Sequence, residues 1–185
     1  MSLYGYTHAG CLRPNGVDGV MSVFVYASAI KDIIKGIKYH AVPDAFHELF
    51  LCVYDPSMSR FLQFGRQHPG ALLQPMPLHP TRYKERGFNQ SGHIASFFST
   101  LALYEVISGL RRDRSTKPQA QLRDPRQRAQ NMRNAFSVIP EVAMKEKTVV
   151  LVDDVITSGS TIKEAAGIIK KAGAKEVFAW TLARG

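Results

Sequence analysis

Two adjacent carboxylates, Asp153 and Asp154, follow an apolar run and precede a loop of small polar residues. The run 149–152 is typical of a strand buried on both faces, and the small polar residues after it predict that the strand ends there. Carboxylates at the end of such a strand accept hydrogen bonds from the vicinal hydroxyls of a sugar, and they hold Mg²⁺ through water. An alternative interpretation is that the two acids cap the turn that follows them.

The loop after the acids predicts a site for a phosphate group. Beyond it, apolar residues recur at helical spacing up to Ala172 and stop at Gly173, so the loop leads into a helix N-terminus. Backbone amides and the helix macrodipole attract a phosphate dianion at that end, and Gly159 lets the backbone approach it closely. A sugar phosphate with its ribose on the two acids therefore suits this segment. The residues expected to contact its phosphate are Thr157, Ser158, Gly159, Ser160 and Thr161.

A second candidate anion site is the proline-rich segment 75–87, which follows a short apolar run at 71–76. Its prolines predict an irregular, rigid loop. An open α/β sheet binds anions at the carboxyl ends of its strands, so we expect this basic loop to face a pyrophosphate. Arginine binds such a group with paired donors, and lysine binds it as a point charge. The alternative is a surface loop with a salt bridge through Glu85. The candidate ligand residues are Arg82, Lys84, Arg86 and Gly87.

Strand patterns alternate with helix patterns along the chain. Strands are expected at 19–26, 71–76, 104–110, 148–152 and 176–182, and helices at 29–39, 43–54, 89–101 and 161–172. This alternation predicts an α/β fold with an open, mainly parallel, twisted sheet flanked by helices. Both candidate loops would lie at its carboxyl edge. We expect residues 1–60 to form a small N-terminal hood packed on a core of residues 61–185, within one compact domain.

Positive charge is concentrated in one part of the chain. The formal net charge is +9, and eight of the 24 Lys and Arg residues lie between 111 and 133, against two acids. The segment 115–136 is polar and interrupted by prolines, which favours a mobile flap with one short helix starting near Asp124 as N-cap. A flap that closes over the site would exclude water from an electrophilic sugar. The alternative is a solvated surface.

The composition is that of an ordinary globular protein, with 185 residues of which 45% are hydrophobic. No apolar run approaches the roughly 18 residues of a membrane span, and the N-terminus lacks a signal-peptide pattern. We therefore expect a soluble, cytoplasmic protein without a membrane span. Cys11 and Cys52 are the only cysteines, which excludes a disulfide framework and a zinc site of four thiolates within this sequence.

The apolar run, the acid pair and the Thr-x-Gly-x-Thr loop resemble the phosphoribosyl pyrophosphate (PRPP) signature of type I phosphoribosyltransferases. The resemblance implies that Asp153 and Asp154 contact the ribose hydroxyls and that the loop 157–161 binds the 5′-phosphate. It also implies Mg²⁺ as the cofactor. One departure concerns Thr157, which stands where the base-salvage branch commonly has an aspartate that assists the nucleobase.

Further segments resemble the ComF/GntX family, the competence-associated branch of this class. They are Gly16-Val17-Asp18-Gly19, Ile37-Lys38-Tyr39, Pro77 through Arg86-Gly87-Phe88-Asn89-Gln90, Thr116-Lys117-Pro118-Gln119 to Arg126, and Asn131 to Phe136. The segment 86–90 is the most specific of these markers. Family members commonly begin with a small four-cysteine zinc module. Here only residues 7–11 resemble its tail, so we expect that module to be missing or truncated.

The resemblance implies a Mg²⁺-dependent phosphoribosyltransferase, which is a glycosyltransferase that moves a pentosyl group. PRPP would pass its phosphoribosyl group to a nitrogen acceptor and release pyrophosphate, with Asp153, Asp154 and Arg86 as the candidate catalytic residues. Ribose 5-phosphate, which is PRPP without its pyrophosphate, is expected to bind at the same acids and loop. The alternative is a non-catalytic accessory of DNA uptake, in which the basic run binds single-stranded DNA or a competence partner and the PRPP pocket is retained. An oligomer is compatible with either function.

Overall fold

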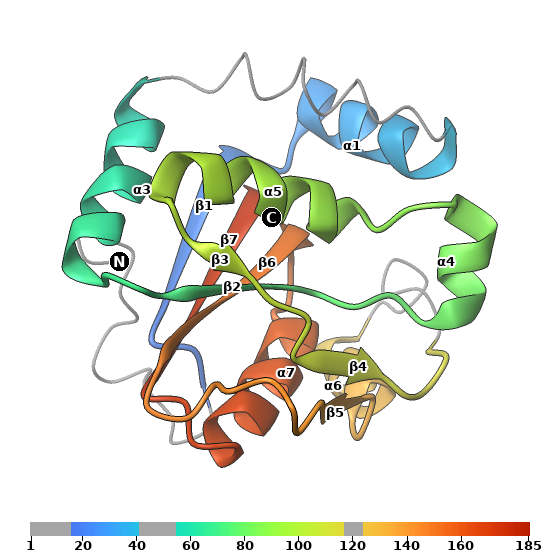
Figure 1. The fold of residues 1–185 in the computed structure, drawn as a ribbon. Helices are drawn as coiled ribbons and strands as arrows, with labels where there is room; N and C mark the ends of the chain where they lie inside the picture. Colours follow the sequence, from blue (N-terminus) through green and yellow to red (C-terminus); the bar gives the residue numbers. More distant parts are fainter. Residues whose placement is uncertain (1–15, 41–54, 117–123) are drawn as a thin grey trace.

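An open five-stranded sheet forms the centre of the molecule, with the strand order β1-β7-β6-β2-β3 (Figure 1). The structure is a computed structural model that describes residues 16–40, 55–116 and 124–185. All neighbouring strands of this sheet are parallel, which confirms the predicted α/β fold. The strands are β1 Gly19–Val25, β2 Leu72–Pro75, β3 Glu105–Val106, β6 Thr148–Ile156 and β7 Glu176–Arg184.

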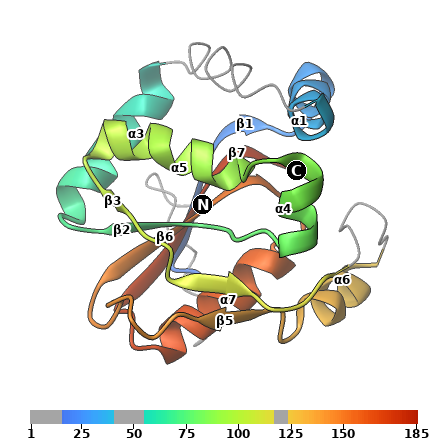
Figure 2. The same cartoon turned by 45° about the vertical axis from the view of Figure 1, so that its right-hand side comes forward.

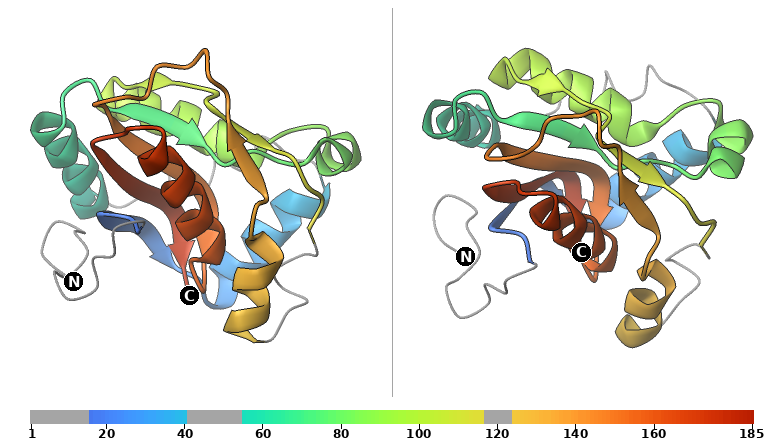
Figure 3. Two further views of the ribbon diagram at one scale, coloured as in Figure 1. Left: turned by 90° about the horizontal axis from the view of Figure 1, so that it is seen from below. Right: turned by 60° about the horizontal axis from the view of Figure 1, so that its bottom comes forward.

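Helices cover both faces of the sheet (Figures 2 and 3). One face packs against α1 Ser28–His40, α3 Asp55–Gln67 and α5 Gln90–Ala102. The other packs against α7 Ser160–Lys171 and a two-stranded antiparallel ribbon of β4 Leu110–Arg112 and β5 Phe136–Val138, and α6 Pro125–Met132 lies beside α7. The helix expected at 43–54 lies outside the described residues. None of the helices in the described ranges is both long and apolar enough to cross a membrane.

Strand β6 is buried on both faces, as its apolar run predicted. Val150 and Val152 belong to the core beneath α3 and α5, whereas Val149 and Leu151 belong to the core beneath α7. All four side chains are fully shielded from solvent. Because side chains alternate between the two faces of a strand, a continuous apolar run fits a central strand with helices on both sides.

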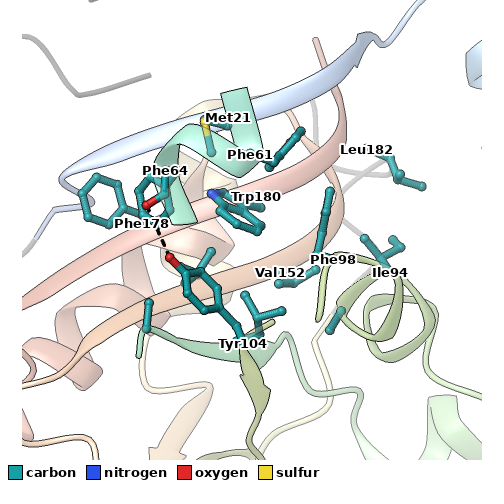
Figure 4. Close-up of a cluster of buried hydrophobic side chains, with 14 of the residues drawn as sticks. Met21, Phe61, Phe64, Ile94, Phe98, Tyr104, Val152, Phe178, Trp180 and Leu182 are labelled. Atoms are coloured by element: carbon teal, nitrogen blue, oxygen red, sulfur yellow. Dashed lines mark hydrogen bonds between the residues drawn. The ribbon is translucent and has the colours of Figure 1, made fainter. Parts of the chain in front are cut away.

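The core beneath α3 is built from aromatic rings around Trp180 (Figure 4). The Trp180 ring lies 4.8 Å from that of Phe61 and 5.2 Å from those of Phe64 and Phe98, each at a steep angle. Edge-to-face pairs of this kind stabilise a core beyond the area that they bury. Tyr104 completes the cluster, and its buried hydroxyl donates to the backbone oxygen of His68 at 2.7 Å.

The Tyr104 hydroxyl provides a test of this core. Burial raises the pKa of Tyr104 to about 12, so the group is a neutral hydrogen-bond donor at pH 7. Substitution Tyr104→Phe removes that donor, and we expect the free energy of unfolding in urea to fall by about 1 kcal/mol. The exposed Tyr83 is the matched control, because Tyr83→Phe should change this free energy little. Equal losses in both variants would contradict the assignment.

Two expectations about regular structure are wrong. The segment 75–87 is not irregular throughout, because α4 Pro80–Arg86 is helical. Pro80 occupies the first helical turn, where its missing N–H would have no helical partner anyway. His79 caps the helix, and Gly87 ends it in the left-handed conformation.

The strand expected at 104–110 is divided into two. Residues 105–106 pair with β2, whereas β4 pairs antiparallel with β5 in the separate ribbon. Between them, the amide of Gly109 donates to the side chain of the buried Gln74, and a Cβ at position 109 would meet Met144 at 2.9 Å. The chain therefore leaves the main sheet where the backbone of Gly109 lies close to the Met144 side chain, which a larger residue would have to displace.

Candidate functional site

The acid pair lies within β6, not after it. Pairing with β7 continues from Asp153 opposite Thr181 to Ile156 opposite Arg184, and the amide of Gly185 donates to the Ile156 oxygen at 3.0 Å. The expected end of this strand at residue 152 is thus wrong. Polar residues extend it because the hydrogen-bonded ladder with β7 outweighs their low strand propensity. The ladder holds the backbone of both acids at the carboxyl edge of the sheet.

The carboxylate of Asp153 is held by two donors. Its Oδ1 atom accepts from the Ser91 hydroxyl at 3.0 Å and from the Asp154 amide at 2.9 Å. Ser91 lies in the first turn of α5, so the acid is tied to the helix on the neighbouring face. Asp154 itself is nearly buried, at 9% exposure. The pair therefore presents oxygens whose positions are set by the surrounding structure.

The loop after the acids leads into α7, as expected. Gly159 is its N-cap in the left-handed conformation, with φ of 71°, and it offers no side-chain acceptor to the amides of the first turn. Ser160 and Thr161 already belong to that turn, and the hydroxyls of Ser158 and Ser160 lie 3.0 Å apart. A helix N-terminus capped by glycine suits an external anion, because the macrodipole favours negative charge there.

The candidate pyrophosphate residues lie on α4 and differ in their contacts. Arg86 donates from Nη1 to Oε1 of Gln90 at 3.1 Å. Arg82 pairs with Glu85 at 2.7 Å, so the salt bridge weighed as the alternative is present. Lys84 is exposed in the last turn of the helix. Only Arg86 is thus connected to the α5 turn that contacts Asp153.

Arg112, at the end of β4, interacts electrostatically with several candidate residues, although the sequence did not single it out. Burial lowers the pKa of Arg112, and so do the positive charges of Arg82, Arg86 and Arg114, whereas the Asp153 carboxylate raises it. These groups therefore interact electrostatically, and positive charge exceeds negative charge among them. The concentration of basic residues at 111–133 was the one available signal. Such a cluster favours a polyanionic ligand.

The basic segment 111–133 contacts the loop 157–161 through the helix α6. Asp124 caps the short helix α6 by accepting from the Arg126 amide at 2.8 Å, which confirms the helix expected there. Nη1 of Arg128, on the same helix, lies 3.5 Å from Oγ1 of Thr157. Residues 117–123, which belong to the expected flap, lie outside the described residues.

The two carboxylates of the acid pair fit a Mg²⁺ ion whose other ligands are water molecules and phosphate groups of a bound substrate. No group of three or more His, Cys, Asp or Glu side chains within the described residues is arranged to enclose a metal ion. Mg²⁺ usually keeps several waters and is held by one or two carboxylates together with substrate phosphates. Asp153 and Asp154 suit that mode of binding. Cys11 and Cys52 lie outside the described residues.

The carboxyl half of the chain, which contains the acid pair and the loop after it, is similar to a known domain family. The family described as phosphoribosyl transferase domain matches residues 95–185. Competence protein F of Haemophilus influenzae is 34% identical over 138 residues, covering 74% of this chain and 58% of that protein. The DNA utilization protein YhgH of Salmonella typhimurium is 35% identical over 176 residues, covering 94% and 76% respectively.

The chain belongs to the ComF family, which confirms the resemblance seen in its motifs. Among solved structures, the purine phosphoribosyltransferase from Pyrococcus horikoshii Ot3 overlaps with a TM-score of 0.37 at 16% identity, over 69% of this chain and 82% of that one. The family assignment follows from the sequence relatives and the domain match.

Proposed function

We propose that this protein is a Mg²⁺-dependent phosphoribosyltransferase with PRPP as donor and a nitrogen nucleophile as acceptor. The 5′-phosphate would bind on residues 157–161, the ribose on Asp153 and Asp154, and the pyrophosphate beside Arg82, Lys84 and Arg86. The observation that carries the proposal is that hydrogen bonds connect Asp153 and Arg86 to the same turn of α5.

The chemistry requires no covalent intermediate with the protein. A bond forms between the acceptor nitrogen and C1 of the ribose, while the bond from C1 to the pyrophosphate oxygen breaks. Negative charge develops on the leaving pyrophosphate, and preorganised guanidinium groups stabilise it. The acid pair orients the ribose by accepting from its hydroxyls. Bound Mg²⁺ would add charge neutralisation on the phosphates, with Asp153 and Asp154 as its water-mediated ligands.

Two measurements test this function. Titration calorimetry with PRPP and Mg²⁺ should give saturable binding that weakens when the metal is chelated. Release of pyrophosphate, followed over a panel of nucleobases, amines and ammonia, should then identify the acceptor. No binding of PRPP in the presence of Mg²⁺ would reject the proposal. Binding without turnover on any acceptor would instead favour a protein that retains the pocket without catalysis.

A second candidate function is favoured by the exposed cations of the basic segment. Arg111, Arg114, Arg126 and Arg133 are all exposed, and relatives bear the names competence protein and DNA utilization protein. We infer that, if the protein contacts DNA, it does so through phosphates and independently of base sequence. Aromatic side chains for base stacking are sparse in this run.

Salt dependence separates this candidate from a merely solvated surface. We expect Arg126→Gln with Arg133→Gln to reduce the slope of log affinity against log salt for single-stranded DNA by about 1.4, because each lost phosphate contact contributes about 0.7. Fluorescence anisotropy measures it. Lys31→Gln with Lys35→Gln, on exposed positions of α1, changes the net charge equally and is the control. Equal slopes in all three proteins would reject this DNA-binding surface.

A further inference from the structure

Three consecutive residues at the start of α5 each bond a different part of the site. The Asn89 side chain caps the helix and donates from Nδ2 to the Met76 oxygen at 3.1 Å, where the chain leaves β2. Gln90 accepts from Arg86 through Oε1. Ser91 donates from Oγ to Asp153 at 3.0 Å. The three contacts reach the chain after β2, the end of α4 and the carboxyl half of β6.

The two inner members of this turn are buried, although both are polar. Gln90 is 2% exposed and Ser91 is 5% exposed. Within the described residues, Nε2 of Gln90 has no hydrogen-bond partner. Burying polar groups costs free energy unless their bonds are made, so an apolar residue would suit stability better at position 90. The glutamine at position 90 is therefore explained by the position that it gives to Arg86, and not by a contribution to the stability of the fold.

The helix that carries this turn is firmly anchored. Ile94, Ala95 and Phe98 follow on the same helix, and all three are fully buried against the sheet. The turn therefore has little freedom to move relative to β6. A side chain that is hydrogen-bonded to this turn is therefore also held in place. This lowers the conformational entropy that is lost when a ligand binds.

We propose that the Asn89–Ser91 turn is a positioning unit that sets the distance between the acid pair and the pyrophosphate cations. Ser91 orients Asp153 for the ribose, and Gln90 orients Arg86 for the pyrophosphate. Neither side chain contacts the reacting atoms, so both are positioning residues. The inference rests on the proposed function, since it presumes that Asp153 and Arg86 bind the two ends of PRPP.

The two contacts can be separated by the choice of ligand. Ribose 5-phosphate has the ribose but no pyrophosphate, and inorganic pyrophosphate has no ribose. Substitution Ser91→Ala should weaken ribose 5-phosphate binding about tenfold and leave pyrophosphate binding unchanged. Substitution Gln90→Met keeps the length and approximate volume of the side chain but removes its amide. It should weaken pyrophosphate binding about tenfold and leave ribose 5-phosphate binding unchanged. Tenfold corresponds to the loss of one bond to a charged group.

Titration calorimetry with Mg²⁺ and each of the three ligands measures these effects, and PRPP should weaken in both variants. Ser96→Ala is the matched control, because Ser96 lies exposed on the same helix and its hydroxyl donates to the Gly92 oxygen, away from the site. It should bind all ligands like the wild type. A partly unfolded variant would lose all ligands together, whereas the proposal demands loss of one ligand and retention of the other.

The outcomes distinguish this inference from the function on which it rests. If the wild type binds PRPP and both variants lose the two partial ligands equally, or lose neither, the positioning unit is rejected while the function stands. If the wild type binds neither PRPP nor the partial ligands, the proposed function is rejected and this inference with it. Opposite selectivity in the two variants supports the inference.

Discussion

Replacing Asp153 and Asp154 together by asparagine is expected to weaken PRPP and ribose 5-phosphate binding by at least about a hundredfold, because two charged acceptors are lost. The substitutions keep side-chain volume, and an asparagine oxygen at position 153 still accepts from Ser91 and from the neighbouring amide. The fold should therefore persist. Titration calorimetry measures the binding, and circular dichroism monitors the fold.

The control for this variant carries the same change in charge. Asp32→Asn with Glu141→Gln also removes two negative charges, but both of these side chains are exposed. It should bind both ligands like the wild type. If the test variant retained wild-type affinity, the acid pair would have no role in holding the ribose. If both variants lost affinity equally, net charge would explain the effect.

Substitution Gly159→Val is expected to abolish ribose 5-phosphate binding. Gly159 adopts φ of 71°, a conformation that a β-branched residue resists, and the phosphate is expected beside this backbone. Within the protein a Cβ at this position meets only ordinary contacts, the nearest at 3.7 Å from Ile156. Loss of affinity would therefore reflect the altered loop backbone and the space that the anion needs. Calorimetry with ribose 5-phosphate measures it.

Gly70 offers a close control for the conformational cost. It adopts φ of 70° in the turn after α3, and a Cβ added there would meet nothing within 4 Å beyond its chain neighbours. Gly70→Val should thus lose about 1–2 kcal/mol of stability from the left-handed backbone, and Gly159→Val a similar amount. Only Gly159→Val should lose the ligand. Weak binding in the Gly70 variant would show that reduced stability alone accounts for the loss.

Local patterns predicted much of the fold because their physical causes are local. The apolar run of β6, the helical spacing of α7 and the cap at Asp124 each depend on a few neighbouring residues. Pro80 misled the prediction, because a proline that breaks a helix interior also fits a first turn. The division at Gly109 depends on Gln74 and Met144, which are distant in sequence.

The candidate site was predictable only in part for the same reason. Asp153, Asp154 and Gly159 lie in one continuous segment whose composition indicates their chemistry. Ser91 and Arg112 lie far from that segment and have ordinary residue types, so no spacing rule connects them with it. Their interactions with Asp153 appear only when β2, β6 and the ribbon bring the segments together. The N-terminal hood expected of residues 1–60 stays a prediction.

The pairing of β1 with β7 has a consequence for synthesis on the ribosome. Strand β1 pairs only with β7 in this sheet, and Asp18 accepts from the Val177 amide across 159 residues of sequence. Until that last strand leaves the exit tunnel, β1 has no neighbour within this sheet and the aromatic core lacks Trp180. Closing so long a loop is slow and entropically costly. The nascent chain therefore leaves the apolar side chains of β1 without their sheet partner until β7 has been synthesised, and chaperones could bind them during that time.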